Sequence, residues 1–454
     1  MQSVVPTAKR AGLTLEIVKL AMPIVGMNLA FALHGFVDTL FMGRISTDAV
    51  ASVGLGGLVF FTLLLLIRGT VNGIVPFASQ AFGAKDLKAV AQALQHFLWL
   101  ALILCLAIPV FWLAFPAVFT LAGATPAVTA GALEFANIRL WEIPFNLLTT
   151  VLTGFLTSLG DSRRPMLLMW TQVLLNILFN WLLALGNLGF PALGLRGSAI
   201  ATVLATVVGA LLTVFVVFLR RKALSLKLEW DVPKPSELLK ILRISAPLGV
   251  MEFIEVGAFT AFLALTGRLG TAELAATQVA NQISALAFMP GFGFSVAASS
   301  LVGRFIGARD IPTATRAGYH AVWLCVAWMG VVGVGFWVFA EPMMRLFISD
   351  QNVIALGSSV LKLMAFYQVF DAANIVFRAA LNGAGDTQFT AVTTLLASWS
   401  LMLGGGWLLA FVFKLGLLGA WGGPFIYLTL LAFVYGLRWR SGVWITKARL
   451  GGES

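Results

Sequence analysis

Twelve long apolar windows, each bounded by charged or turn residues, most strongly constrain how this chain can fold. A helix of about 20 residues crosses the roughly 30 Å apolar layer of a bilayer. Because 59% of the 454 residues are hydrophobic and only 11% are charged, no soluble domain could bury so much apolar side chain. We therefore predict an all-α polytopic membrane protein with twelve transmembrane helices. Their approximate spans are 18–43, 50–80, 93–116, 136–158, 166–187, 195–219, 244–267, 275–303, 318–340, 356–382, 388–411 and 415–437.

The sequence repeats itself at a spacing of 224 or 225 residues. MPIVGM at Met22–Met27 aligns with APLGVM at Ala246–Met251, and LTSLGDS at Leu156–Ser162 aligns with LNGAGDT at Leu381–Thr387. Six helices per repeat is an even number, so both halves enter the membrane from the same side. This predicts two six-helix lobes related by a pseudo-twofold axis along the membrane normal, an arrangement found in transporters. The predicted parts are the lobes at 1–219 and 244–437, a cytoplasmic linker at 220–243 and a cytoplasmic tail at 438–454.

Basic residues predict the orientation of the chain. With the N-terminus in the cytoplasm, 22 Lys and Arg side chains fall on the cytoplasmic side and 6 on the other. This bias agrees with the positive-inside rule and explains the net charge of +11 without a nucleic-acid partner. The first apolar window contains Pro23 and Asp38 and lacks a cleavage pattern, so it is interpreted as a membrane helix. We expect a multi-pass protein of the cytoplasmic (inner) membrane with both termini cytoplasmic.

Four carboxyl groups fall inside the apolar windows: Asp38, Glu252, Glu255 and Asp371. A charge near the middle of a bilayer costs about 2.5–3.5 kcal/mol on insertion scales, so such residues indicate function. Glu255 lies about a dozen residues from the nearest arginine on either side, which places it near mid-membrane.

The tenth window carries a polar face. Tyr367, Asp371, Asn374 and Arg378 follow one another at helical spacing and share that face. A purely structural alternative is that Asp371 forms an ion pair with Arg378, but about 10 Å of helix separates the two residues. The face therefore favours a binding role for Asp371.

Glu252 and Glu255 lie three residues apart on one face of the seventh window. Two carboxylates this close in a low-dielectric medium cannot easily both be ionised, so one is expected to bind a proton or a cation. For Glu252, a structural ion pair with Arg68 or Arg139 is an equal alternative.

The first half has its own polar residues. Asp38 could form a second cluster with Asn176 and Asn180, which lie one turn apart on the fifth window. The alternatives are a helix-end pair of Asp38 with Arg44 or His34, and amides that serve only to hold helices together. Gln278 and Asn281 on the eighth window are open to the same two interpretations.

The sequence lacks the HExxH, P-loop and GxSxG patterns of common enzymes. We therefore expect no enzymatic activity and no cofactor. Without a nucleotide-binding loop, transport would be driven by an ion gradient. A rival hypothesis is a lipid-linked saccharide flippase, which would use Arg68, Arg139 and Arg378 to bind pyrophosphate.

Several segments resemble the multidrug and toxic compound extrusion (MATE) transporters, specifically their NorM-like branch. The similarity covers nearly the whole chain. It is carried by FVDTLFMGRIS at Phe36–Ser46, SLGDSRRPM at Ser158–Met166, NILFNWLLALGNLGFPALGLRGSAIAT at Asn176–Thr202, PLGVMEFIEVGAF at Pro247–Phe259, FMPGFGFSVAASSLVGRFIGARD at Phe288–Asp310 and YQVFDAANIVFRAALNGAGDT at Tyr367–Thr387.

The resemblance implies a multidrug antiporter that exports small organic cations in exchange for Na⁺ or H⁺. It further implies a coupling-cation site, with Na⁺ as one candidate ion, at Glu255 and Asp371 beside Tyr367. No obligatory protein partner is implied. The chain departs from many relatives at Gln278, which lacks a preceding histidine, and at Asn382, where an arginine is common. The residues do not choose between Na⁺ and H⁺, and they name no natural substrate.

Overall fold

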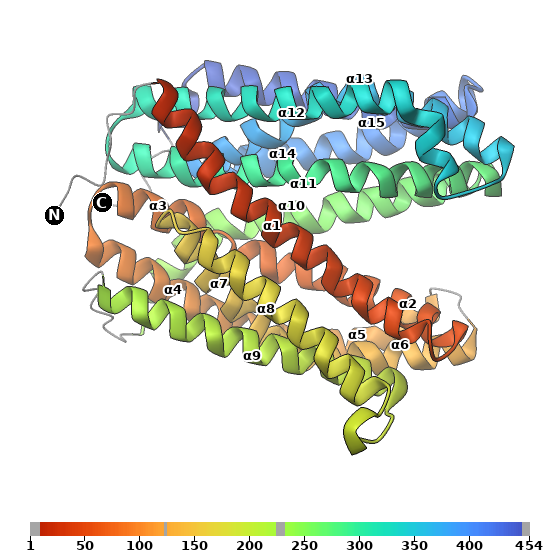
Figure 1. The fold of residues 1–454 in the computed structure, drawn as a ribbon. Coiled ribbons are helices and arrows are strands. Elements are labelled where there is room, and N and C mark those ends of the chain that lie inside the picture. The colour runs from red at the N-terminus through yellow and green to blue at the C-terminus, as the bar shows by residue number, and fades with distance from the viewer. Residues whose placement is uncertain (1–9, 122–124, 224–231, 447–454) are drawn as a thin grey trace. The chain divides into compact units, whose positions relative to one another are not determined.

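The computed structural model describes residues 10–121, 125–223 and 232–446, and the regular secondary structure in these ranges is helical (Figure 1). Ten of the described helices are long and apolar enough to cross a membrane, or eleven if the two parts of α11 count as one. The predicted all-α membrane fold is confirmed, and these spans, together with α6 and α7 over the predicted window 136–158, are consistent with twelve membrane crossings. The helices are α1 (Arg10–Met42), α2 (Thr47–Val71), α3 (Ile74–Gly83), α4 (Leu87–Leu104), α5 (Ala107–Leu121), α6 (Pro126–Arg139), α7 (Ile143–Ser158), α8 (Arg163–Phe179), α9 (Gly194–Ala223), α10 (Pro235–Gly267), α11 (Thr271–Gly307), α12 (Ile311–Arg345), α13 (Gln351–Ala384), α14 (Thr387–Ala397) and α15 (Gly416–Arg440).

Several predicted spans consist of more than one helix. The span 50–80 breaks between α2 and α3, and the span 93–116 breaks between α4 and α5. Pro109 is the third residue of α5, and proline is tolerated in a first turn, where its missing N–H is not needed. The predicted linker 220–243 is helical at both ends, since α9 extends to Ala223 and α10 begins at Pro235. Residues 224–231 of the linker and 447–454 of the tail lie outside the described residues.

The duplication is visible in local geometry. α1 and α10 are each 33 residues long and contain a proline at the equivalent positions 23 and 247. Lys85 and Arg309 adopt the left-handed backbone conformation, with φ of 58° and 60°. The next residue in each turn, Asp86 or Asp310, caps the following helix by accepting a hydrogen bond from the backbone N–H three residues on, at 2.9 and 3.0 Å. The two repeats therefore share a turn that neither glycine nor proline specifies.

By packing, the described chain forms two units that do not coincide with the repeats. The C unit contains residues 10–25, 79–85 and 250–446, and the N unit contains the remaining described residues. The first part of α1 therefore packs with the second repeat, while residues 235–249 of α10 pack with the first repeat. These boundaries, 25/26 and 249/250, are themselves 224 residues apart. The predicted lobe boundaries stay a prediction.

Close backbone contacts in the C unit are also reciprocal. A Cβ atom on Gly83 would lie 1.8 Å from the carbonyl oxygen of Arg304, and one on Gly307 would lie 1.8 Å from that of Gln80. Gln80 and Arg304 are equivalent in the two repeats, as are Gly83 and Gly307. Only glycine fits at these two crossings.

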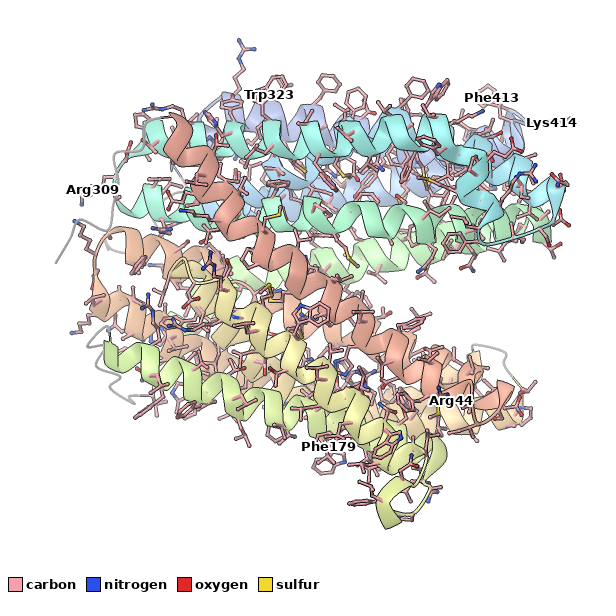
Figure 2. All side chains as sticks on the ribbon, viewed as in Figure 1. Arg44, Phe179, Arg309, Trp323, Phe413 and Lys414 are labelled. Carbon is pink, nitrogen blue, oxygen red and sulfur yellow. The ribbon has the colours of Figure 1, made fainter. Side chains whose placement is uncertain are left out.

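Large apolar side chains cover much of the outer surface. Trp323 on α12 and Phe413, which follows the last turn of the eleventh span, are 72% and 61% exposed and project outward from the ribbon (Figure 2). Exposed apolar area on this scale is unfavourable in water and suits contact with lipid.

Candidate functional site

The N unit buries Asp38 among hydrogen-bond donors from two other helices. Its Oδ1 atom accepts hydrogen bonds from the Nδ2 atoms of Asn176 on α8, at 3.1 Å, and of Asn180, at 3.0 Å. Its Oδ2 atom accepts a bond from the Thr202 hydroxyl on α9 at 2.9 Å. We call these four residues the Asp38 cluster. Three donors solvate the carboxylate, and His34, one turn earlier on α1, also interacts with it electrostatically.

The two amides of the Asp38 cluster keep unused acceptors. The Oδ1 atoms of Asn176 and Asn180 are buried, and within the described part of the chain they have no hydrogen-bond partner. Asn180 opens a π-helical turn, Asn180–Ala184, that continues α8, and its Nδ2 atom also contacts the Asn176 carbonyl at 3.0 Å. Such turns are rare and often occur at functional sites. Rotation of either amide by a half turn would present an oxygen to a cation in place of its N–H donors.

A second charged group lies beside the Asp38 cluster. Arg139 binds Glu142 through two hydrogen bonds, Nε to Oε2 at 3.0 Å and Nη2 to Oε1 at 2.9 Å. The Arg139 guanidinium also stacks over the Phe60 ring at 4.6 Å. Arg139 interacts electrostatically with Asp38. Because its charge is balanced by Glu142, this arginine leaves the Asp38 carboxylate uncompensated.

The C unit buries a polar face of α13, as the sequence predicts. Tyr367, Asp371 and Asn374 are 3%, 3% and 2% exposed. The Asn374 Nδ2 atom lies 3.5 Å from Asp371 Oδ1, at the limit of a hydrogen bond. Asp371 Oδ2 and Asn374 Oδ1 are buried without a partner among the residues that the structure describes. Asp371 is therefore much less well solvated than Asp38.

Glu255 on α10 contacts the other end of this polar face, at Arg378. Its Oε1 atom accepts hydrogen bonds from Arg378 Nη1 at 2.6 Å and from the Tyr427 hydroxyl on α15 at 3.0 Å. Asp371 interacts electrostatically with both Glu255 and Arg378. We call Tyr367, Asp371, Asn374, Arg378, Glu255 and Tyr427 the Asp371 cluster.

The remaining candidates are more exposed than Asp38 and Asp371. Glu252 is half-buried one turn before Glu255, Asn281 is half-buried on α11, and Gln278 is exposed on the same helix. Arg139, an alternative partner for Glu252, binds Glu142 instead.

Sequence reasoning did not identify Thr202 or Tyr427. Thr202 ends a conspicuous motif in the fifth to sixth windows, but buried threonines usually bond to their own helix. Tyr427 is one of only four tyrosines, and this scarcity is the signal that could have marked it.

Comparison with protein families finds one family, described as MatE, that matches residues 23–182 and again 247–408. The two matches begin 224 residues apart, which is the spacing of the repeat. The chain is 30% identical over 446 residues to a probable multidrug resistance protein NorM of Thermotoga maritima, covering 96% of this chain and 94% of the relative. It is 31% identical to the protein of the same name from Pseudomonas putida, covering 96% and 97%.

Solved structures share the fold. A crystal structure of MATE in the bent conformation aligns with a TM-score of 0.88 at 24% identity, over 98% of this chain and 99% of that one. The outward-facing conformation of a multidrug resistance MATE family transporter of the MOP superfamily aligns with a TM-score of 0.87 at 25% identity, over 98% and 100%.

Proposed function

The chain belongs to the MatE family, and on this premise we propose that it is a secondary active multidrug efflux antiporter. It exports small organic cations in exchange for Na⁺ or H⁺ by alternating access. The observation that carries the proposal is the pair of buried carboxylates, Asp38 and Asp371, one in each packing unit. Each lies beside buried amide oxygens that have no partner among the described residues.

These two clusters suit the binding of a monovalent cation or a proton. Hard cations prefer carboxylate, amide and hydroxyl oxygens, and the Asp38 cluster offers all three types. A proton would satisfy the free Oδ2 atom of Asp371 equally well. Both clusters therefore support coupling by a cation without selecting the ion.

Exchange requires that the coupling cation and the drug favour different conformations of the protein. A ligand shifts a conformational equilibrium only by its differential affinity for the two states. Asp38 is contacted from three helical segments, so a cation that replaces its amide donors would change how those segments are held together. An organic cation would be attracted by the same negative charges.

The rival function, a lipid-linked saccharide flippase, would need free arginines for pyrophosphate. Arg139 and Arg378 instead bind Glu142 and Glu255. The positive charges of these two arginines are balanced by carboxylates of the protein, which favours a cationic over an anionic substrate. The proposed location is the cytoplasmic (inner) membrane, with both termini in the cytoplasm.

Reconstituted full-length protein tests the proposal. Vesicles loaded with ethidium are given an inward Na⁺ gradient or an inward proton gradient separately, with the protein inserted so that its cytoplasmic face is inside. We expect ethidium efflux with at least one gradient and much slower efflux with neither. Equal ethidium efflux in all conditions would contradict coupling to an ion. Failure of either ion gradient to drive ethidium out of the vesicles against its concentration gradient would contradict active efflux.

A further inference from the structure

Glu255 is compensated by groups of the protein itself. Its Oε1 atom lies 2.6 Å from Arg378 Nη1 and 3.0 Å from the Tyr427 hydroxyl. The side chains of Arg378 and Glu255 are only 14% and 27% exposed, so water screens this pair little. A short, charge-assisted hydrogen bond in such surroundings is strong.

Asp371 lies in the same cluster without such a partner. Its Oδ1 atom has one long contact to Asn374, and its Oδ2 atom is buried with no hydrogen-bond partner in the described ranges. Glu255, Arg378 and Asp371 interact electrostatically, so their charges are best counted together. Two carboxylates and one guanidinium leave a single negative charge.

We propose that Arg378 is a built-in counter-ion that neutralises Glu255 and so limits the Asp371 cluster to one exchangeable cation, held at Asp371. This inference rests on the proposed antiport. It assigns Arg378 a positioning role and removes Glu255 from direct contact with the exchanged ion.

The surroundings of Arg378 suit a fixed charge. A guanidinium stays protonated at any physiological pH, and its fork of donors matches a carboxylate. Glu255 faces it from α10, Tyr427 and Tyr435 interact with it from α15, and Asp371 lies two turns earlier on its own helix. Glu255 is the nearest anion in this set. If Glu255 loses its charge, the guanidinium charge is no longer balanced, and it repels a cation at Asp371 through their electrostatic interaction.

Removing each partner should therefore have opposite effects. Glu255→Gln leaves the Arg378 charge unbalanced, which weakens binding of the exchanged cation at Asp371. Arg378→Gln leaves two uncompensated carboxylates, which admit a second cation. The double variant Glu255→Gln/Arg378→Gln again has one negative charge, at Asp371, and should behave like the wild type.

Equilibrium binding of ethidium to purified full-length protein measures these effects, with Na⁺ concentration and pH varied separately. Wild-type protein should lose ethidium as the coupling ion is added. A wild type that responds to neither ion would contradict the proposed function itself. We expect Glu255→Gln to weaken the competition by the ion about tenfold or more, and the double variant to restore it to within about twofold. Arg378→Gln should raise the number of ions displaced per ethidium by about one.

Two further variants separate this role from a structural one. Arg378→Lys keeps the positive charge and should keep the wild-type number of displaced ions. Asp386→Asn/Arg438→Gln removes another buried pair of the C unit, joined at 2.8 Å, and should alter thermal stability without altering ion competition. A double variant at positions 255 and 378 that folds but competes as weakly as Glu255→Gln would overturn the proposal. So would an Arg378→Lys variant that gains an ion as Arg378→Gln does.

Discussion

Asn180 donates a hydrogen bond to Asp38 at 3.0 Å, and it is also the residue at which α8 passes into a π-helical turn. The donor and the helix irregularity are thus the same position. A π-helical turn changes which residues face a neighbouring helix, because it inserts one residue into the turn. Local rewinding of this segment would withdraw one of the donors that solvate the Asp38 carboxylate.

Replacing the Asp38 carboxylate should abolish ion-coupled efflux. Asp38→Asn keeps the size of the side chain but removes its charge, and Thr202→Val removes one donor to that charge. Hydrogen bonds to charged groups contribute about 1.5–3 kcal/mol, so Thr202→Val should change apparent ion affinity by about tenfold to a hundredfold. The measurement is ethidium efflux against Na⁺ concentration or pH.

Thr213→Val is the matched control for that experiment. Both threonines are buried on α9 and contact a carbonyl of that helix, Ser198 for Thr202 at 3.2 Å and Gly209 for Thr213 at 2.7 Å, but in the described structure only the Thr202 hydroxyl also bonds to Asp38. Thr213→Val should retain wild-type ion affinity. Equal effects at positions 202 and 213 would argue against a role for the Asp38 cluster.

Asp371→Asn should abolish coupled efflux, while the protein still inserts into the membrane. The variant removes the carboxylate whose buried oxygen lacks a partner in the described structure, so no exchangeable charge remains in the Asp371 cluster. Glu255→Gln should also lose coupling. Asp350→Asn, at the N-cap of the same helix, is the control, because Asn caps helices as well as Asp does. Wild-type transport by Asp371→Asn would refute the assignment.

Breaking the Arg139–Glu142 pair should destabilise the fold more than removing both partners. Glu142 is 1% exposed, and loss of one partner of a buried pair costs about 3–5 kcal/mol because it strands a charge. Thermal unfolding in detergent should therefore show a large loss for Glu142→Gln. The double variant Arg139→Met/Glu142→Leu should lose much less. Similar losses in both would show that the packing, and not the charge balance, matters.

Adding a methyl group at Gly83 or Gly307 should prevent correct folding. Each new Cβ atom would overlap a backbone carbonyl oxygen, which cannot move as a flexible side chain can. Gly257→Ala is the control, since a Cβ there meets no atom within 4 Å and alanine favours helix. The yield of monodisperse protein from gel filtration compares them. Normal yields for Gly83→Ala and Gly307→Ala would contradict the reciprocal close contact.

The sequence predicted the helices well because membrane length and apolar composition are strong signals. It could not predict the breaks, since the apolar windows continue through them. The left-handed turn at Lys85 and Arg309 could not be predicted either, because glycine or asparagine, and not lysine or arginine, usually adopts this backbone conformation.

The sites were predicted in part. Helical spacing alone placed Tyr367, Asp371 and Asn374 on one face, and the structure buries all three together. Spacing could not show that Arg378 reaches across to Glu255, because that contact depends on how α10 and α13 pack. Tyr427, 172 residues from Glu255, was beyond any local pattern. The roles of these residues in ion binding stay predictions.

The first helix of each repeat is divided between the two packing units. Residues 10–25 pack with the second repeat and 235–249 with the first, and the glycine contacts at 83 and 307 mirror each other. In both repeats the divide falls inside one continuous helix, between residues 25 and 26 of α1 and between residues 249 and 250 of α10. Each packing unit therefore contains part of the first helix of both repeats, so neither unit is built from one repeat alone.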